Sequence, residues 1–127
     1  MDDTSRESLV ERYLAAYNRF DVDGMLAVLS NDVRFENYSG DVLTASASGI
    51  DEFRSLAEQA CALFCEREQR LTSLELAPGA ATACIAYRGR LAADIPGGPP
   101  PGTLLELAGT SEFSFDGGRI VRIVDRS

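Results

Sequence analysis

The sequence predicts a single α+β domain, spanning residues 1–127, in which three helices in the N-terminal half pack on a strongly curved sheet. Two observations carry this prediction. Apolar residues recur at helical spacing in three early segments, and strand-like alternation with short turns dominates the second half. With 127 residues, the chain is long enough for one hydrophobic core but not for two.

The first helix is predicted to begin at the capping-box motif Thr-Ser-Arg-Glu of residues 4–7. Its apolar face consists of Leu9, Val10, Tyr13, Leu14, Tyr17 and Phe20. The triplet Asp-Val-Asp of residues 21–23 ends this helix and caps a short second helix, predicted over 24–29. Asn31 and Asp32 are predicted to end that second helix.

A strand is expected over 33–38, with Val33, Phe35 and Asn37 on one face. Residues 39–48 are small and polar, which favours a loop that covers the mouth of a pocket. Residues 48–51 then cap a third helix. Its apolar face consists of Ile50, Phe53, Leu56, Ala57, Ala60, Cys61 and Phe64.

The remaining strands are predicted over 67–76 and 81–93 and in the hairpin of 103–125, whose turn is Asp-Gly-Gly at 116–118. If Ile120 and Ile123 both face the core, the alternation slips once along the last strand. We expect this hairpin to form the middle of the sheet. The strand glycines Gly89 and Gly109 favour bends, and a bent sheet around helices leaves a cone with an apolar interior pocket.

Composition excludes several classes of function. The net charge of −8 without a basic block disfavours nucleic acid and anionic membranes as partners. No leader or spanning segment is recognised, so a cytoplasmic location is expected. Three cysteines without paired spacing fit a reducing compartment. The absence of histidine removes histidine-based triads and most transition-metal sites, so we expect no metal and no cofactor.

Three stretches resemble the nuclear transport factor 2-like superfamily. They are Tyr13 with the Asp-Val-Asp of 21–23, the segment Leu-Ser-Asn-Asp-Val-Arg-Phe-Glu-Asn of 29–37, and Phe-Asp-Gly-Gly-Arg-Ile of 115–120. The superfamily includes ketosteroid isomerases, limonene epoxide hydrolases and SnoaL-like polyketide cyclases. The resemblance implies a cystatin-like α+β roll over nearly the whole chain, and it implies no single activity, because this fold hosts many functions.

Against the ketosteroid isomerases, Tyr13 matches the oxyanion-hole tyrosine and Asn37 stands where that family has its aspartate base. An amide takes no proton near neutral pH, so this mechanism loses its base. Ser111 stands near the family's protonated aspartate, and Ala57 where a supporting tyrosine would be.

The other two families keep Asp125. Limonene epoxide hydrolases carry Tyr-x-Asn on the first strand, here Phe35-Glu36-Asn37, and an aspartate that matches Asp125. Their Arg-x-Asp pair has no counterpart, since Arg88 and Arg90 lack the acid partner. SnoaL-like cyclases use an aspartate near this position as acid/base, together with pocket histidines that this chain lacks.

Two hypotheses of function follow. In the first, the chain is a SnoaL-like domain that binds a small apolar molecule and has no complete known active site. In the alternative, it is a cofactor-independent hydrolase, isomerase or cyclase, in which Asp125 is the acid/base and Asn37 and Tyr13 orient water or a carbonyl. The expected ligand-binding residues are Tyr17, Phe35, Phe53, Phe64, Tyr87, Ser111 and Phe113.

The orientation of Asp125 separates these hypotheses, because an aspartate in solvent at a frayed end of the chain supplies no pocket base. The charged run that contains Glu66, Arg67, Glu68 and Arg70 is interpreted as a solvated start of a strand. Neither face of the long strand 81–93 is strongly charged before Arg88. Helices cover one face, and a second copy of the chain is the simplest cover for the other, so a homodimer through the sheet face is expected.

Overall fold

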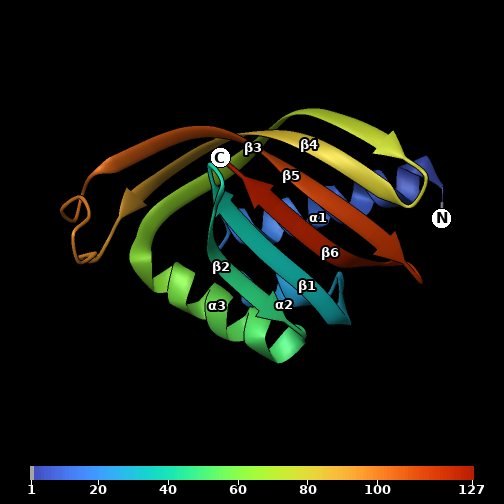
Figure 1. Cartoon of the computed structure of the whole chain (residues 1–127), viewed down its shortest axis with the longest axis horizontal. Helices are drawn as coiled ribbons and strands as arrows, with labels where there is room; N and C mark the ends of the chain where they lie inside the picture. The colour runs from blue at the N-terminus through green and yellow to red at the C-terminus, as the bar shows by residue number, and fades with distance from the viewer. Residues whose placement is uncertain (1) are drawn as a thin grey trace.

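The computed structural model describes residues 2–127 and confirms the predicted α+β architecture. Its elements in chain order are α1 (Asp3–Asn18), α2 (Val22–Leu26), β1 (Leu29–Ser39), β2 (Val42–Ser48), α3 (Ile50–Leu63), β3 (Phe64–Ala77), β4 (Ala80–Leu91), β5 (Leu104–Asp116) and β6 (Arg119–Arg126). The strands form one sheet in the order β2-β1-β6-β5-β4-β3. The sheet arches over α1, and α3 lies at its lower edge in Figure 1.

The β5–β6 hairpin lies at the centre of this sheet, as the sequence predicts. Gly117 and Gly118 form its turn with positive φ angles of 59° and 78°. The expected slip of the last strand is present. Ser114 of β5 pairs with Arg122 and Phe115 pairs with Ile120, so Val121 is one extra residue in β6. Because of this one extra residue, Ile120 and Ile123 are both buried and Asp125 shares the face of Ile123.

The structure corrects the prediction made for residues 39–48. The expected loop is largely the edge strand β2, which turns back at Gly40 and pairs antiparallel with β1. Strand β1 pairs parallel with β6 on its other side, so the sheet is mixed. Strand β2 contacts α3, and its residue Ala47 is buried.

The start of the first helix and the end of the second also differ from the prediction. Helix α1 begins at Asp3, because the Asp2 side chain accepts a hydrogen bond from the Ser5 N–H and caps the helix earlier than the capping box would. Asp21 caps α2 as expected, but the helix ends at Leu26. The predicted helix end at residues 31–32 is wrong, because β1 already begins at Leu29 and pairs there with Ile120.

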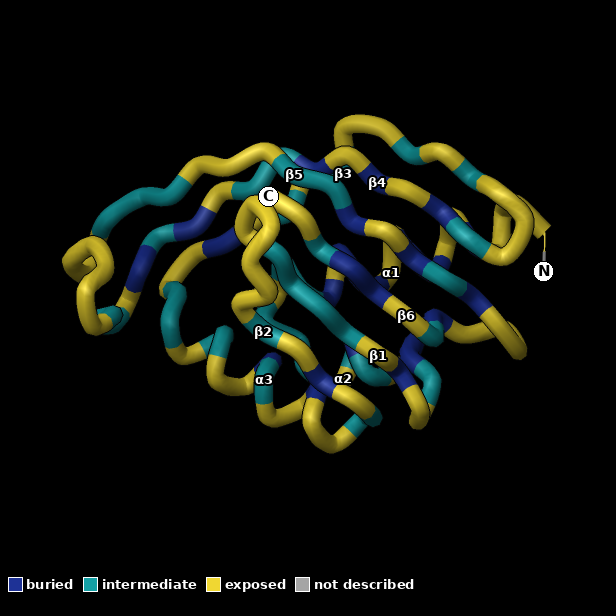
Figure 2. Tube along the Cα trace, in the orientation of Figure 1, coloured by how far each residue is buried: buried dark blue, intermediate teal, exposed yellow. Residues whose placement is uncertain are grey.

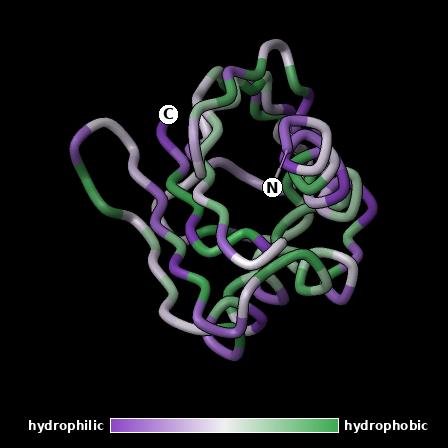
Figure 3. The backbone as a smooth tube through the Cα atoms, turned by 90° about the vertical axis from the view of Figure 1, so that its right-hand side faces the viewer, coloured by the Kyte–Doolittle hydropathy of each residue, from purple (hydrophilic) through white to green (hydrophobic). Residues whose placement is uncertain are grey.

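The core lies between the helices and the concave face of the sheet. Figure 2 shows buried segments alternating with exposed ones along the strands, as expected for a sheet with one covered face. Figure 3, a quarter turn away, looks along α1, and apolar and polar stretches alternate along the tube. The largest fully buried side chains are Phe113, Leu91, Ile120, Ile123, Val10, Val28 and Val33.

Within residues 2–127, none of the helices has the length and apolar character needed to cross a membrane.

Candidate active site

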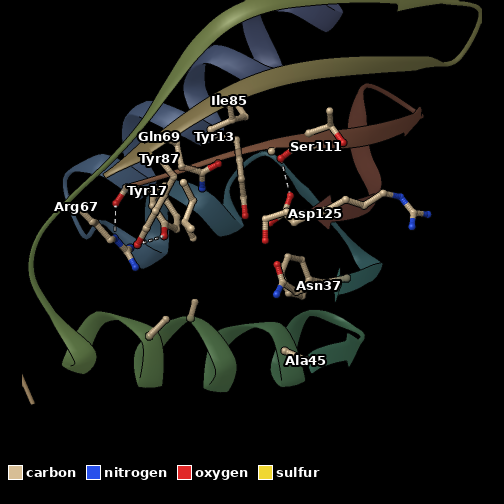
Figure 4. A pocket seen from close by; sticks show the side chains of 18 of the residues that line it. Tyr13, Tyr17, Asn37, Ala45, Arg67, Gln69, Ile85, Tyr87, Ser111 and Asp125 are labelled. Atoms are coloured by element: carbon tan, nitrogen blue, oxygen red, sulfur yellow. Dashed lines mark hydrogen bonds between the residues drawn. The ribbon is translucent and has the colours of Figure 1, made fainter. Parts of the chain in front are cut away.

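A cavity of about 340 Å³ lies between the helices and the concave face of the sheet. This volume is at the lower end of the range for small-molecule pockets. Most of its lining is apolar, including Met25, Phe53, Leu56, Ala57 and Ile85. The polar side chains that line it lie at two separate places, one around Asp125 and one around Arg67 (Figure 4).

The first polar group follows from the register of three neighbouring strands. Asn37 of β1 is paired with Asp125 of β6, and Asp125 is paired with Ser111 of β5. Residues paired across adjacent strands project to the same face, so the three side chains form a row. This face is the concave one, and all three residues line the cavity.

Asp125 points into the cavity and not into solvent (Figure 4). The Ser111 hydroxyl donates a hydrogen bond to Asp125 Oδ1 at 2.6 Å. Burial raises the pKa of Asp125 to about 6, although the hydrogen bond from Ser111 opposes this by favouring the ionised form. The alternative of a solvated aspartate at a frayed end is therefore wrong. A carboxyl group with this pKa exchanges protons readily near neutral pH.

Tyr13 and Asn37 flank Asp125. Tyr13 is 3% exposed, and burial, followed by the charge of Asp125, holds the pKa of its phenol well above the usual range. The phenol therefore stays protonated and remains a hydrogen-bond donor. The Asn37 side chain is fixed by Thr44, because Nδ2 donates to Thr44 Oγ1 at 2.7 Å and the same hydroxyl donates to the Asn37 carbonyl. The structure brings all three predicted catalytic residues to one cavity.

Five of the seven predicted ligand-binding residues also line the cavity: Tyr17, Phe35, Phe53, Tyr87 and Ser111. The other two do not. Phe113 is 1% exposed and packs in the core between Tyr13 and Phe115. Phe64 packs edge-on against the ring of Tyr87, outside the cavity lining, because β3 begins there and turns the ring toward β4.

Arg67 is a cavity residue that the sequence interpretation missed. It is 6% exposed and lines the cavity, so the expected solvated strand start is wrong at this position. Glu66, Glu68 and Arg70 are exposed as expected. The alternation of the strand could have indicated this burial. Arg67, Gln69 and Leu71 alternate with the exposed residues and share the inward face.

A family comparison identifies the chain. The family model for the SnoaL-like domain matches residues 10–123, which include the C-terminal half of α1, the strands β1 to β5 and most of β6. The chain belongs to the SnoaL-like domain family. The resemblance to the nuclear transport factor 2-like superfamily is thereby confirmed, and so is the prediction of a SnoaL-like domain without an assigned substrate.

Solved structures share this SnoaL-like fold over nearly the whole chain. A candidate polyketide cyclase from Xanthomonas campestris is 23% identical with a TM-score of 0.85, covering 98% of this chain and 90% of its own. A candidate polyketide cyclase from Pseudomonas putida is 26% identical with a TM-score of 0.73, covering 92% and 86%. A cystatin-fold protein from Novosphingobium aromaticivorans is 20% identical with a TM-score of 0.74, covering 93% and 94%. The search of curated proteins found no match.

Proposed function

We propose that this SnoaL-like protein is a cofactor-independent enzyme that transfers protons at carbon in a small, largely apolar carbonyl compound. One observation carries the proposal: Asp125 is a cavity carboxyl group with its pKa raised to about 6. A base of this strength is mostly ionised at pH 7 and is still readily protonated during turnover. Two solved structures of the same fold are described as candidate polyketide cyclases, and polyketides are carbonyl compounds, which supports the choice of substrate.

The row of side chains assigns a role to each group. The Asp125 carboxylate takes a proton from the carbon next to the substrate carbonyl, and the electron pair of that C–H bond moves to the carbonyl oxygen. The Tyr13 phenol donates a hydrogen bond to the resulting enolate oxygen. The enolate carbon then either takes a proton back or attacks a second carbonyl of the same molecule, whose oxygen receives the proton from Asp125. Asn37 orients the substrate beside the carboxylate.

The proposal is tested by following exchange of carbon-bound protons in D2O by NMR, with aryl-substituted 1,3-diketones and β-keto esters as substrates. The wild-type protein is expected to accelerate the exchange over buffer, and Asp125→Asn is expected to reduce the rate by about a hundredfold or more, because the amide is no base. Asp116→Asn, which makes the same change at an exposed position of the hairpin turn, serves as the control. Equal rates for wild type and Asp125→Asn would overturn the proposal.

The alternative function is binding of a small apolar molecule without turnover. The largely apolar lining favours it, since such a surface binds ligand whether or not Asp125 acts on it. In that case ligands shift the NMR signals of the cavity residues, while no substrate exchanges protons faster than in buffer.

We further propose that the protein is intracellular and forms a homodimer through the outer face of the sheet. All three cysteines are unpaired, and Cys65 and Cys84 are exposed, which suits a reducing compartment. The middle of the outer face carries small side chains such as Cys84 and Ala86 of β4, opposite Thr110 and Ala108 of β5. Small, weakly polar residues allow two such faces to approach closely.

A further inference from the structure

In the part of the chain that the structure describes, Arg67 is a buried cation without a carboxylate partner. Among the described residues, two arginines are buried, Arg6 at 8% exposure and Arg67 at 6%. Arg6 pairs with Asp3 and donates to the Ala77 carbonyl, so its charge is compensated. Arg67 is absent from the ion pairs that the described residues form. Within residues 2–127, its charge therefore has no counterion.

The contacts of Arg67 hold the guanidinium in place without neutralising it. Nε donates to the Tyr17 carbonyl at 3.1 Å, and Nη2 lies 3.5 Å from the Cys61 sulfur, a weak acceptor. The guanidinium carbon Cζ lies 3.7 Å from the centroid of the Tyr17 ring and 4.5 Å from the centroid of the Phe20 ring. The buried Nη1 has no hydrogen-bond partner within the described residues.

An unpaired buried donor on a cation is costly, so a structure that retains one usually provides a partner for it. Arg67 lines the cavity, so a counterion for its charge would bind there. The side-chain carboxylate of Asp125 also lines the cavity, but it lies at the opposite end in Figure 4 and accepts a hydrogen bond from Ser111. The charge of Arg67 therefore remains available to a ligand.

A second donor lies beside Arg67. The Tyr17 hydroxyl donates to the Tyr87 hydroxyl at 3.4 Å, which leaves the Tyr87 proton free for another acceptor. Burial raises the pKa of Tyr87, so this phenol stays protonated. Gln69 lines the same end of the cavity, two residues along β3 from Arg67. Together these side chains present several donors and one positive charge to the same space.

We propose that Arg67 and Tyr87 form a subsite for a carboxylate group of the ligand. A carboxylate has two oxygens that accept from a guanidinium and a phenol together, and its charge neutralises Arg67. The preferred ligand is then an apolar molecule with a carboxylate at one end and, where the proposed proton transfer holds, a reacting carbonyl at the other end beside Asp125. The subsite itself depends only on the cavity binding a ligand.

The test compares 2-naphthoate with 2-naphthamide, which has the same shape without the charge, by isothermal titration calorimetry at pH 8. The wild-type protein is expected to bind 2-naphthoate about tenfold more tightly than 2-naphthamide, as charge-assisted hydrogen bonds exceed neutral ones. Arg67→Gln is expected to remove this preference, and Arg67→Lys to restore part of it. Arg70→Gln makes the same change at an exposed position of the same strand and should keep the full preference.

The outcomes separate this inference from the proposed catalysis. If wild-type protein binds the two compounds equally, or Arg67→Gln keeps the preference, the carboxylate subsite is overturned whatever the activity. The wild-type comparison decides this even if Arg67→Gln does not fold. If the preference depends on Arg67 while Asp125→Asn exchanges substrate protons as fast as wild type, the subsite holds and the proposed role of Asp125 fails.

Discussion

The ionised form of Asp125 destabilises the folded protein that contains it. Its pKa rises from 3.8 in the unfolded chain to about 6 in the cavity. The folded state thus binds this proton more tightly, so the contribution of Asp125 to stability is lost as pH rises from about 4 to about 6. A shift of this size corresponds to a loss of at most about 3 kcal/mol in the free energy of unfolding. The loss is smaller than this limit because one side of the carboxyl group faces the cavity.

Asp125→Asn removes this penalty, because an amide has no charge to desolvate. We expect the free energy of unfolding at pH 8 to rise by about 1–3 kcal/mol relative to wild type, with the gain shrinking toward pH 4. Urea unfolding across this pH range measures the difference. Asp116→Asn, in the exposed turn, should show no such pH dependence, and a constant difference for Asp125→Asn would contradict the buried location of its charge.

Individual site residues were predictable to the extent that spacing and resemblance marked them. Asp125 and Asn37 match positions that related families use, and the register places both in one row. Arg67 was missed because a charged residue among charged neighbours usually faces water. Its burial depends on Tyr17 in the last turn of α1 and on Phe20 just after that helix, whose rings lie against the guanidinium, and a strand pattern contains no information about that contact.

Among the secondary-structure elements, the close approach of β6 to β5 depends on Gly109. A Cβ atom at this position would lie 2.3 Å from the Arg126 carbonyl oxygen, so the backbone of one strand would have to move. Arg126 follows Asp125 directly, so a shift here also displaces the carboxyl group. The absence of a side chain at residue 109 thereby helps to position the proposed base.

Gly109→Ala is expected to lower the free energy of unfolding by about 1–3 kcal/mol, as overpacking in a well-packed region does. It should also change the pKa of Asp125, measured by carbon NMR of its carboxyl group. Ser114→Ala on the same strand, on the outer face, is the control. Wild-type stability and an unchanged pKa in Gly109→Ala would show that the two strands do not approach so closely.

The elements differ in how well the sequence predicts them. The central hairpin was predictable because the glycines of its turn and the alternation of its strands both indicate a hairpin. Strand β2 was not, since Leu43, Thr44, Ala45 and Ser46 lack a strong apolar alternation, and an edge strand with an exposed outer side needs none. Its existence depends on pairing with β1, a tertiary interaction that is not encoded within the segment itself.

At the scale of the whole molecule, a homodimer through the outer sheet face is expected. In sedimentation at micromolar concentration under reducing conditions, the wild-type protein should be dimeric. Cys84→Arg, which places a charge in the middle of this face, should give monomers, because a buried unpaired charge opposes association. Gln59→Arg adds the same charge on the exposed side of α3 and should leave the dimer intact. A monomeric wild-type protein would refute this mode of assembly.

The parallel pairing of β1 with β6 affects how the chain reaches its folded state. The β1–β2 hairpin and the β3–β5 strands each form from neighbouring segments, but β6 alone joins these two halves. Joining them requires residues from distant parts of the sequence to meet, which costs loop-closure entropy before any contact is gained. Folding should therefore be slower than that of helical proteins of similar size. Asp125 can meet Ser111 within the β5–β6 hairpin, but the row is complete only when β6 pairs with β1 and brings Asn37 beside the proposed base.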